Sequence, residues 1–183
     1  MKKRLFLAIQ LPPDMRQDLG KYKRMVKVHD AHWTAEENLH VTTYFLGDID
    51  EQVIENLTAD LAAAVATVLP FTIVPRYITF APPHDPRRMI WLQFHGNQAF
   101  TNLVSMCYHA ITVYLHGQQA YDEARVTPHV TLARLSRPPT PGIELPRVGL
   151  PEVPVTSVDL VESVLMHQGP LYTVLETFTL RGV

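Results

Sequence analysis

The chain has 183 residues, of which 46% are hydrophobic and 19% charged, and its formal net charge is −2. This composition is typical of a globular protein and excludes a disordered or fibrous chain. The near-neutral charge argues against a protein that coats long stretches of nucleic acid, because such binding needs many cations against the phosphates. A single cysteine, Cys107, excludes a disulfide within the chain and favours a cytoplasmic protein.

The first half of the chain alternates short apolar runs with amphipathic segments. The apolar run at 5–9 is too short to cross a membrane, and it has the alternation of a strand. Pro12 and Pro13 then open a helix, and Asp48 or Asp50 can cap the next one. The expected elements are a strand at 5–9, a helix at 12–26, a polar loop around His29, His32 and Trp33, a strand at 39–46 ended by Gly47, a helix at 54–64, and strands at 71–80 and 89–94.

The second half has a similar order of elements. Asn97 can cap a helix whose apolar side carries Phe100, Val104, Cys107 and Ile111 and which is ended by Gly117, and a strand is expected at 126–135. The segment 136–154 holds six prolines and is expected to be an irregular connection before strands at 155–165 and 172–180. Strands interrupted by single helices predict an α+β fold with antiparallel sheets and helices outside. We expect one domain, 1–183, made of two pseudo-symmetric lobes.

Each half of the chain contains one strand with the pattern His-x-Thr. His40 and Thr42 lie two residues apart, as do His129 and Thr131. Because side chains i and i+2 of a strand point to the same face, each strand presents an imidazole and a hydroxyl together. Two such strands facing one another would form a polar site with two histidines and two threonines.

These four side chains suit phosphoryl transfer without a metal. One imidazole can take a proton from water while the other gives a proton to the leaving oxygen, since histidine titrates near neutral pH. The hydroxyls of Thr42 and Thr131 can hold the non-bridging phosphate oxygens. The scattered histidines show no metal-binding spacing, so we expect neither a metal nor another cofactor.

A third copy of the pattern, His32-Trp33-Thr34, lies among polar residues. Its setting resembles a loop, and we interpret it as incidental. Short motifs of this kind often arise by chance. The functional interpretation of the other two copies therefore depends on their position inside alternating strands.

The chain as a whole resembles the 2H phosphoesterase superfamily, and within it the bacterial RNA 2′,3′-cyclic phosphodiesterases, also called the 2′–5′ RNA ligase family. The resemblance covers almost the whole chain. The matching segments are 4–9 with 11–12, Trp33, 38–42, 45–47, 87–88 with 91–92, 128–134 and 169–172. The chain departs from the family pattern at Thr43 and Tyr44, and at Val126, where a phenylalanine is common. If that phenylalanine stacks on a base, its absence here would change the base preference.

The resemblance implies two α+β lobes with the histidines facing across a central groove. It implies hydrolysis of a terminal 2′,3′-cyclic phosphate to a 2′-phosphomonoester, with reversible 2′–5′ ligation in some members and no cofactor. His40 and His129 are then catalytic, and Thr42 and Thr131 bind phosphate. We favour His129 as the base and His40 as the acid, although the sequence leaves the reverse assignment open.

Further residues are candidates for substrate binding. Arginine forks suit phosphate oxygens and aromatic rings suit bases, so we include Arg87, Arg88, Arg125, Tyr44 and Tyr172. By strand parity Arg134 should point away from His129, unless a bulge reverses it. Phe45 and Trp91 are expected in the core.

Three functions fit these observations. The first is the RNA cyclic phosphodiesterase, acting as a monomer on RNA 3′ ends or small cyclic nucleotides and with no membrane association. The second is a phosphodiesterase or ligase for 2′–5′ linkages or another small cyclic nucleotide. The third is a non-catalytic protein that binds RNA ends, which the intact His and Thr pairs disfavour.

Overall fold

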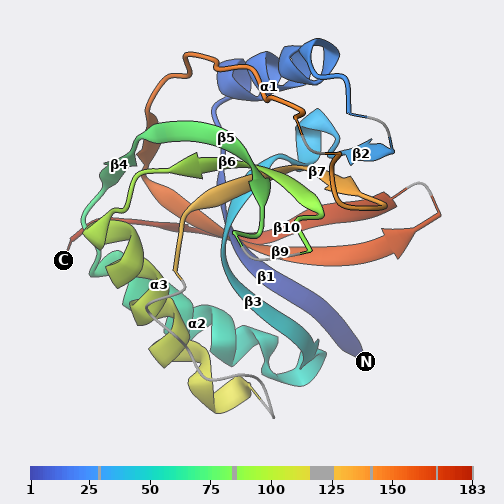
Figure 1. Ribbon diagram of the computed structural model, residues 1–183. Helices are drawn as coiled ribbons and strands as arrows, with labels where there is room; N and C mark the ends of the chain where they lie inside the picture. Colours follow the sequence, from blue (N-terminus) through green and yellow to red (C-terminus); the bar gives the residue numbers. More distant parts are fainter. Residues whose placement is uncertain (29, 84–85, 116–125, 141, 168, 183) are drawn as a thin grey trace.

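The computed structural model contains one eight-stranded sheet with α-helices packed on it (Figure 1). Every strand pair in this sheet is antiparallel. The predicted α+β fold is therefore confirmed. The structure describes residues 1–28, 30–83, 86–115, 126–140, 142–167 and 169–182.

One half of the sheet, here called the terminal half-sheet, contains the first and last strands in the order β10-β9-β1-β3. Strand β3 continues past Gly47, where the sequence predicted its end, because Gly47 has a φ of 72° beside a bulge. Leu5 pairs with Gly47 and Phe6 with Phe45, which leaves one extra residue on β3. The four strands are β1 (Lys2–Gln10), β3 (His40–Asp50), β9 (Ser157–Met166) and β10 (Gly169–Thr179).

The other half, here called the inner half-sheet, is built around β7 (His129–Leu135). It also contains β5 (Pro75–Ala81), β6 (Met89–Phe94) and the short β2 (Ala31–Trp33), which pairs with β7. The predicted polar loop at His32 and Trp33 is thus wrong, because these residues form β2; His29 lies outside the described residues.

The two half-sheets meet at one residue pair, Val41 of β3 opposite Val130 of β7. We call this pair the seam. Val41 and Val130 are both fully buried, and each is the central residue of a His-x-Thr motif. The alternation that turns the valines into the core therefore turns the histidines and threonines to the opposite face.

Three α-helices cover the other face of the sheet, with α2 and α3 side by side (Figure 1). Leu5, Leu7 and Ile9 of β1 share a core with the helices, whereas Phe6 and Ala8 form a separate cluster on the opposite face. The helices are α1 (Pro13–Met25), α2 (Ile54–Ala66) and α3 (Gln98–Ile111).

Of the helix caps predicted from the sequence for α2 and α3, one is confirmed and the other is wrong. The Asn97 side chain accepts a hydrogen bond of 3.0 Å from the backbone N–H of Phe100 at the start of α3, as predicted. At α2 the prediction is wrong, because the short 3-10 helix η2 (Glu51–Val53) separates Asp48 and Asp50 from the first turn. Asp50 precedes η2 and makes no side-chain capping bond.

A two-stranded sheet lies outside the main one and is formed by β4 (Phe71–Ile73) and β8 (Val153–Val155). The single strand predicted at 71–80 is therefore two strands, in different sheets, which separate at Val74. Two further 3-10 helices are η1 (Glu36–Asn38) and η3 (Thr112–Tyr114). Between residue 136 and β8, the described residues form no helix or strand, in agreement with the predicted irregular connection.

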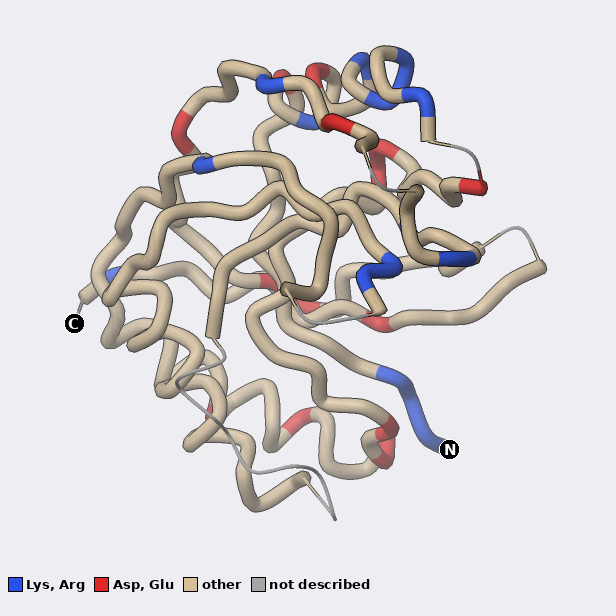
Figure 2. Tube along the Cα trace, viewed as in Figure 1, with Lys and Arg blue, Asp and Glu red and all other residues tan. Residues whose placement is uncertain are grey.

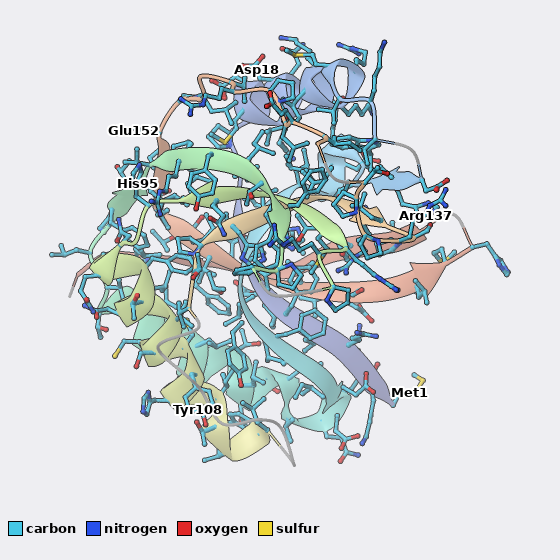
Figure 3. All side chains as sticks on the ribbon, viewed as in Figure 1. Met1, Asp18, His95, Tyr108, Arg137 and Glu152 are labelled. Carbon is cyan, nitrogen blue, oxygen red and sulfur yellow. The ribbon has the colours of Figure 1, made fainter. Side chains whose placement is uncertain are left out.

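Charged residues occur in separate groups, with Lys and Arg on α1 and at the beginning of β1 (Figure 2). Some are paired: Arg137 donates to Asp30 at 2.6 Å, beside the start of β2 (Figure 3). Among the described residues, no helix is long and apolar enough to cross a membrane.

Candidate active site

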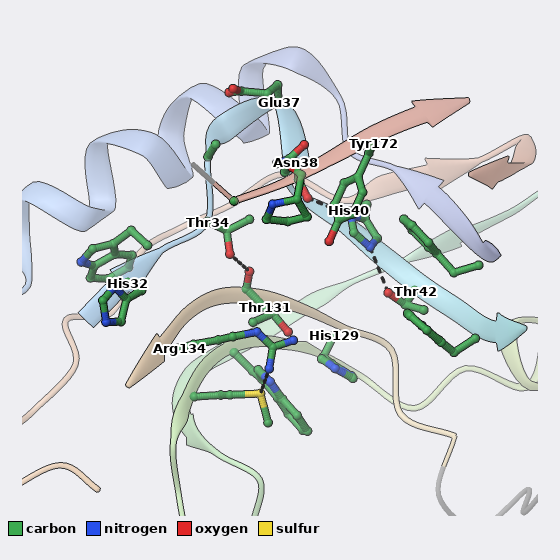
Figure 4. Close-up of a pocket in the computed structure, with 18 of the residues that line it drawn as sticks. His32, Thr34, Glu37, Asn38, His40, Thr42, His129, Thr131, Arg134 and Tyr172 are labelled. Carbon is green, nitrogen blue, oxygen red and sulfur yellow. Dashed lines mark hydrogen bonds between the residues drawn. The ribbon is translucent and has the colours of Figure 1, made fainter. Parts of the chain in front are cut away.

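A cleft of about 1810 Å³ runs along the seam, on the face of the sheet opposite the helices, and both His-x-Thr motifs line it (Figure 4). The Val41–Val130 pair fixes their relation. In an antiparallel register centred on this pair, the residue before Val41 lies opposite the residue after Val130. Each histidine therefore comes opposite the threonine of the other strand. The structure brings together the four residues that the motifs single out.

The His40 ring is held by two hydrogen bonds. Its Nδ1 lies 2.8 Å from the backbone oxygen of Asn38, and its Nε2 lies 3.0 Å from the Thr42 hydroxyl oxygen. Because a carbonyl oxygen only accepts, Nδ1 carries the hydrogen, and in the neutral ring Nε2 accepts from the threonine hydroxyl. The lone pair of Nε2 therefore points at the hydroxyl of Thr42, which lines the cleft.

Aromatic side chains surround His40. Its ring centroid lies 4.9 Å from that of Phe6 and 5.4 Å from that of Tyr172, which meets it edge-on at 82°. Phe6 in turn stacks on Phe45 at 5.9 Å and 8°. Phe45 is 45% exposed and lines the cleft, so its predicted place in the core is wrong.

His129 has a different environment. Its Nδ1 donates to the backbone oxygen of Thr127 at 2.9 Å, by the same argument as for His40. Its ring stacks on the Trp91 indole, with centroids 3.8 Å apart and planes 22° from parallel. Trp91 was expected in the core, but it is half-buried and lines the cleft, and its buried Nε1 has no partner among the described residues. None of the described residues hydrogen-bonds the Nε2 of His129.

Both histidines are shifted toward the neutral form. Burial is the main cause and lowers the pKa of His40 and of His129 below 6.5. The hydrogen bonds from Nδ1 to Asn38 and Thr127 oppose this effect, because they favour the charged ring. The proximity of His129 lowers the pKa of His40 further, so the site disfavours two protonated rings at once.

Arg134 also lines the cleft, and the reason is a bulge in β7. Ile90 pairs with Ala133 and Trp91 with Thr131, so β7 has one extra residue at this point. The extra residue reverses the parity and turns Arg134 to the face of Thr131 (Figure 4). The sequence had named this bulge as the condition for Arg134 to reach the cleft. The positive charge of Arg134 lies near Tyr172, where it partly opposes the rise of the phenol pKa that burial causes.

The other predicted residues divide between the cleft and its surroundings. Tyr44 and Tyr172 line it, although Tyr44 also packs on Tyr108 of α3 with ring centroids 5.5 Å apart. Arg87 and Arg88 are exposed and are not among the residues that line the cleft. Arg125 lies outside the described residues. The binding roles of all five stay predictions.

The third His-x-Thr copy, interpreted from its sequence as incidental, also borders the cleft. His32 and Thr34 both line it. The Thr34 hydroxyl donates to the backbone oxygen of Thr131 at 2.8 Å, and His32 lies 3.1 Å from the hydroxyl of Ser136. Thr34 thus fixes β7 beside a motif threonine. Alternation could not reveal this, because β2 is only three residues long.

No metal centre is evident. The described residues contain no group of three or more histidine, cysteine or carboxylate side chains that could hold a metal ion. Cys107 faces the core from α3, where burial raises the pKa of its thiol to about 12. The reactive groups that line the cleft are imidazoles, hydroxyls, the Arg134 guanidinium and the Glu37 carboxylate.

Comparison with known proteins gives matches over most of the chain. Residues 11–163 match the model of the 2′-5′ RNA ligase superfamily. An RNA 2′,3′-cyclic phosphodiesterase of Methanocaldococcus jannaschii is 29% identical, over 94% of this chain and 98% of its own. One from Thermus thermophilus is 31% identical, over 98% of this chain and 91% of its own.

Solved structures agree with this similarity. TT0787 of Thermus thermophilus superimposes with a TM-score of 0.82 at 29% identity, and 98% of each chain is covered. Escherichia coli LigT, solved with phosphate, superimposes with a TM-score of 0.77 over 98% of each chain. At 24% identity the LigT comparison shows the fold alone.

Proposed function

Because the chain belongs to the 2′-5′ RNA ligase superfamily, we propose that it is an RNA 2′,3′-cyclic phosphodiesterase that hydrolyses a terminal cyclic phosphate to a 2′-phosphomonoester. The observation that carries the mechanism is the seam, which sets two imidazoles and two threonine hydroxyls around one cleft. This arrangement supplies what in-line displacement at phosphorus needs: a base, an acid and donors for the phosphate oxygens.

In the proposed reaction His129 is the base. Its Nε2 takes a proton from water as the water oxygen bonds to phosphorus. The free Nε2 supports this role, because no described side chain competes for its lone pair. The Nδ1–H bond to the carbonyl of Thr127 holds the ring and stabilises the charge that the ring acquires.

His40 is the acid in this scheme. In its protonated form Nε2 gives a proton to the 3′ oxygen as the bond from phosphorus to that oxygen breaks. The reaction consumes one water and leaves the phosphate on the 2′ oxygen. The two rings exchange protonation states in each turnover, so proton transfer to solvent must restore them. Each acid or base contributes roughly 10²–10⁴ to the rate.

The non-bridging oxygens of the phosphate are held by Thr42 and Thr131, with Arg134 at the rim. The anionic phosphate favours the imidazolium form of the acid, which offsets the lowering of its pKa by burial. In the free protein Thr42 donates to His40, so substrate binding would exchange this bond for one to the phosphate. Tyr172 and Tyr44 are the proposed contacts for the nucleoside.

We propose RNA 3′ ends and small cyclic nucleotides as substrates, and a cytoplasmic monomer that acts without a metal. The alternatives are activity on 2′–5′ linkages or another small cyclic nucleotide, with the same residues. A protein that only binds RNA ends is disfavoured by the free Nε2 of His129.

The test is to incubate the purified protein with a short RNA that ends in a 2′,3′-cyclic phosphate, in EDTA, and to identify the product. We expect a 2′-phosphate, formed at the same rate with and without EDTA. A 3′-phosphate product would contradict the assignment of the leaving oxygen. A complete lack of turnover would contradict the proposed function, and 2′–5′ linked oligonucleotides would be the next substrates.

A further inference from the structure

A second cavity, of about 320 Å³, lies beside the cleft, and apart from His40 and Tyr172 the mechanism above does not use its polar groups. Phe6, His40 and Tyr172 line both the cleft and this cavity, so the two meet around these rings. We call it the side cavity. A ligand whose phosphate lies in the cleft can therefore extend into the side cavity past His40.

The register of the terminal half-sheet relates the side cavity to the reaction centre. Thr42 on β3 pairs with Ala8 on β1, and Ala8 pairs with Asp159 on β9. Paired residues share a face of the sheet, so Asp159 and Thr42 lie on the same face, two strands apart. This separation is roughly 10 Å at the usual spacing of neighbouring strands.

Asp159 is a buried carboxylate with little compensation. It is 6% exposed, and one oxygen accepts a hydrogen bond of 2.7 Å from the Thr177 hydroxyl. It has no ion pair with any described residue. Burying a carboxylate is costly unless its oxygens are hydrogen-bonded. The second oxygen therefore offers a strong acceptor to a ligand in the side cavity, which Asp159 lines.

The rest of the side cavity suits a flat, polar-edged ring. Arg16 of α1 is partly buried, lines the cavity and has no side-chain partner in the described part of the chain. Gln10 adds a donor and an acceptor, and Glu37 adds a second, exposed carboxylate. Val161, Val174 and the rings of Phe6 and Tyr172 supply apolar walls. Apolar walls with a few unpaired polar groups are typical of a small-molecule site.

We propose that the side cavity binds the base of the nucleotide that carries the cyclic phosphate, and that it selects guanine. This inference rests on the proposed function. The span from Thr42 to Asp159 matches the distance from the phosphate to the far edge of a purine on the same ribose, whereas a pyrimidine is shorter. Guanine presents two adjacent N–H donors to the Asp159 carboxylate and acceptors to Arg16. Adenine presents an acceptor where guanine has N1–H, and the carboxylate repels it.

The experiment uses four RNAs that differ only in the 3′-terminal nucleotide, each ending in a 2′,3′-cyclic phosphate, and measures kcat/KM for each. We expect guanosine ends to be hydrolysed at least about 10-fold better than uridine ends, as expected where buried polar groups are left unpaired by the wrong ligand. Asp159→Asn keeps the side-chain shape and the hydrogen bond from Thr177. It should bring the ratio of kcat/KM for guanosine ends to kcat/KM for uridine ends close to one. Asp48→Asn, on an exposed residue of β3, is the matched control and should keep the ratio.

A second variant covers the case in which Asp159→Asn does not fold. Val174 is 49% exposed and lines the side cavity, so Val174→Trp fills it without opening the core. It should reduce turnover of purine ends more than turnover of pyrimidine ends. Turnover of all four RNAs at equal rates would overturn this inference and leave the proposed function intact. Turnover of none would overturn the proposed function itself.

Discussion

The two motif histidines share the sequence His-Val-Thr, but their side chains have different neighbours. His40 lies among Phe6 and Tyr172 and hydrogen-bonds its own threonine, Thr42. His129 stacks on a single indole and leaves its Nε2 unoccupied. The common element is the Nδ1 bond to a backbone carbonyl two residues earlier, at Asn38 and at Thr127. The motif thus fixes the tautomer of each ring, and the neighbouring strands make the two rings different.

The largest expected effect is the loss of either imidazole. His40→Ala and His129→Ala should each reduce kcat/KM on a cyclic-phosphate RNA by about 10³-fold, because each removes a proton-transfer group. His95→Ala, on an exposed residue at the end of β6, is the control and should retain the rate (Figure 3). If one of the two variants kept nearly full activity, the assignment of one histidine as acid and the other as base would be wrong.

Substitution of the motif threonines should reduce the activity less than substitution of the motif histidines. Thr42→Val and Thr131→Val should each reduce kcat by roughly 10- to 100-fold, since each removes one donor to the phosphate. Thr42→Ser and Thr131→Ser keep the hydroxyl and should recover most of the rate. Equal losses in the valine and serine variants would show that the methyl group, rather than the hydroxyl, is what matters.

Variants of the aromatic neighbours can distinguish the role of His129 from that of His40. Trp91→Leu removes the ring that orients His129, and Tyr172→Leu removes one that contacts both His40 and the proposed nucleoside site. We expect Trp91→Leu to lower kcat by about tenfold with little change in KM, because misorientation of a base acts on the chemical step. Tyr172→Leu should mainly raise KM. The reverse pattern would exchange the two roles.

The pH profile should reflect the lowered pKa values. The free protein needs one neutral and one protonated histidine, and both pKa values lie below 6.5, so kcat/KM should be greatest below pH 6.5. In the complex the phosphate anion favours the imidazolium, and the maximum of kcat should move to higher pH. A kcat/KM maximum above pH 7 would contradict the burial of both rings.

The smallest effect concerns stability. A histidine whose pKa is lowered in the folded state binds fewer protons there than when unfolded, so the free energy of unfolding falls as the pH drops below about 6.5. The double variant His40→Ala and His129→Ala should lose less of this free energy between pH 7.5 and pH 5. Urea unfolding of both proteins at the two pH values measures the difference.

The sequence predicted the motif strands well because a period of two is a direct consequence of strand geometry. It could not decide where Arg134 points, because a bulge depends on how β6 pairs with β7. It placed Phe45 and Trp91 in the core because apolarity does not distinguish a packed interior from the wall of a cleft. Asp159 went unnoticed, since its relation to Thr42 exists only through the pairing of three strands.

The seam has a mechanical consequence. Within the described part of the sheet, the two half-sheets are joined by the pairing of Val41 with Val130, and their core residues pack together against the helices. If one half-sheet rotates about this point, displacement grows with distance from it. The motif histidines and threonines lie one residue from the seam and would hardly shift. The hairpin of β9 and β10 lies farther away and would move through a larger distance. Such a rotation would leave the geometry of the reacting groups almost unchanged while the mouth of the cleft adjusted to RNA ends of different length and sequence.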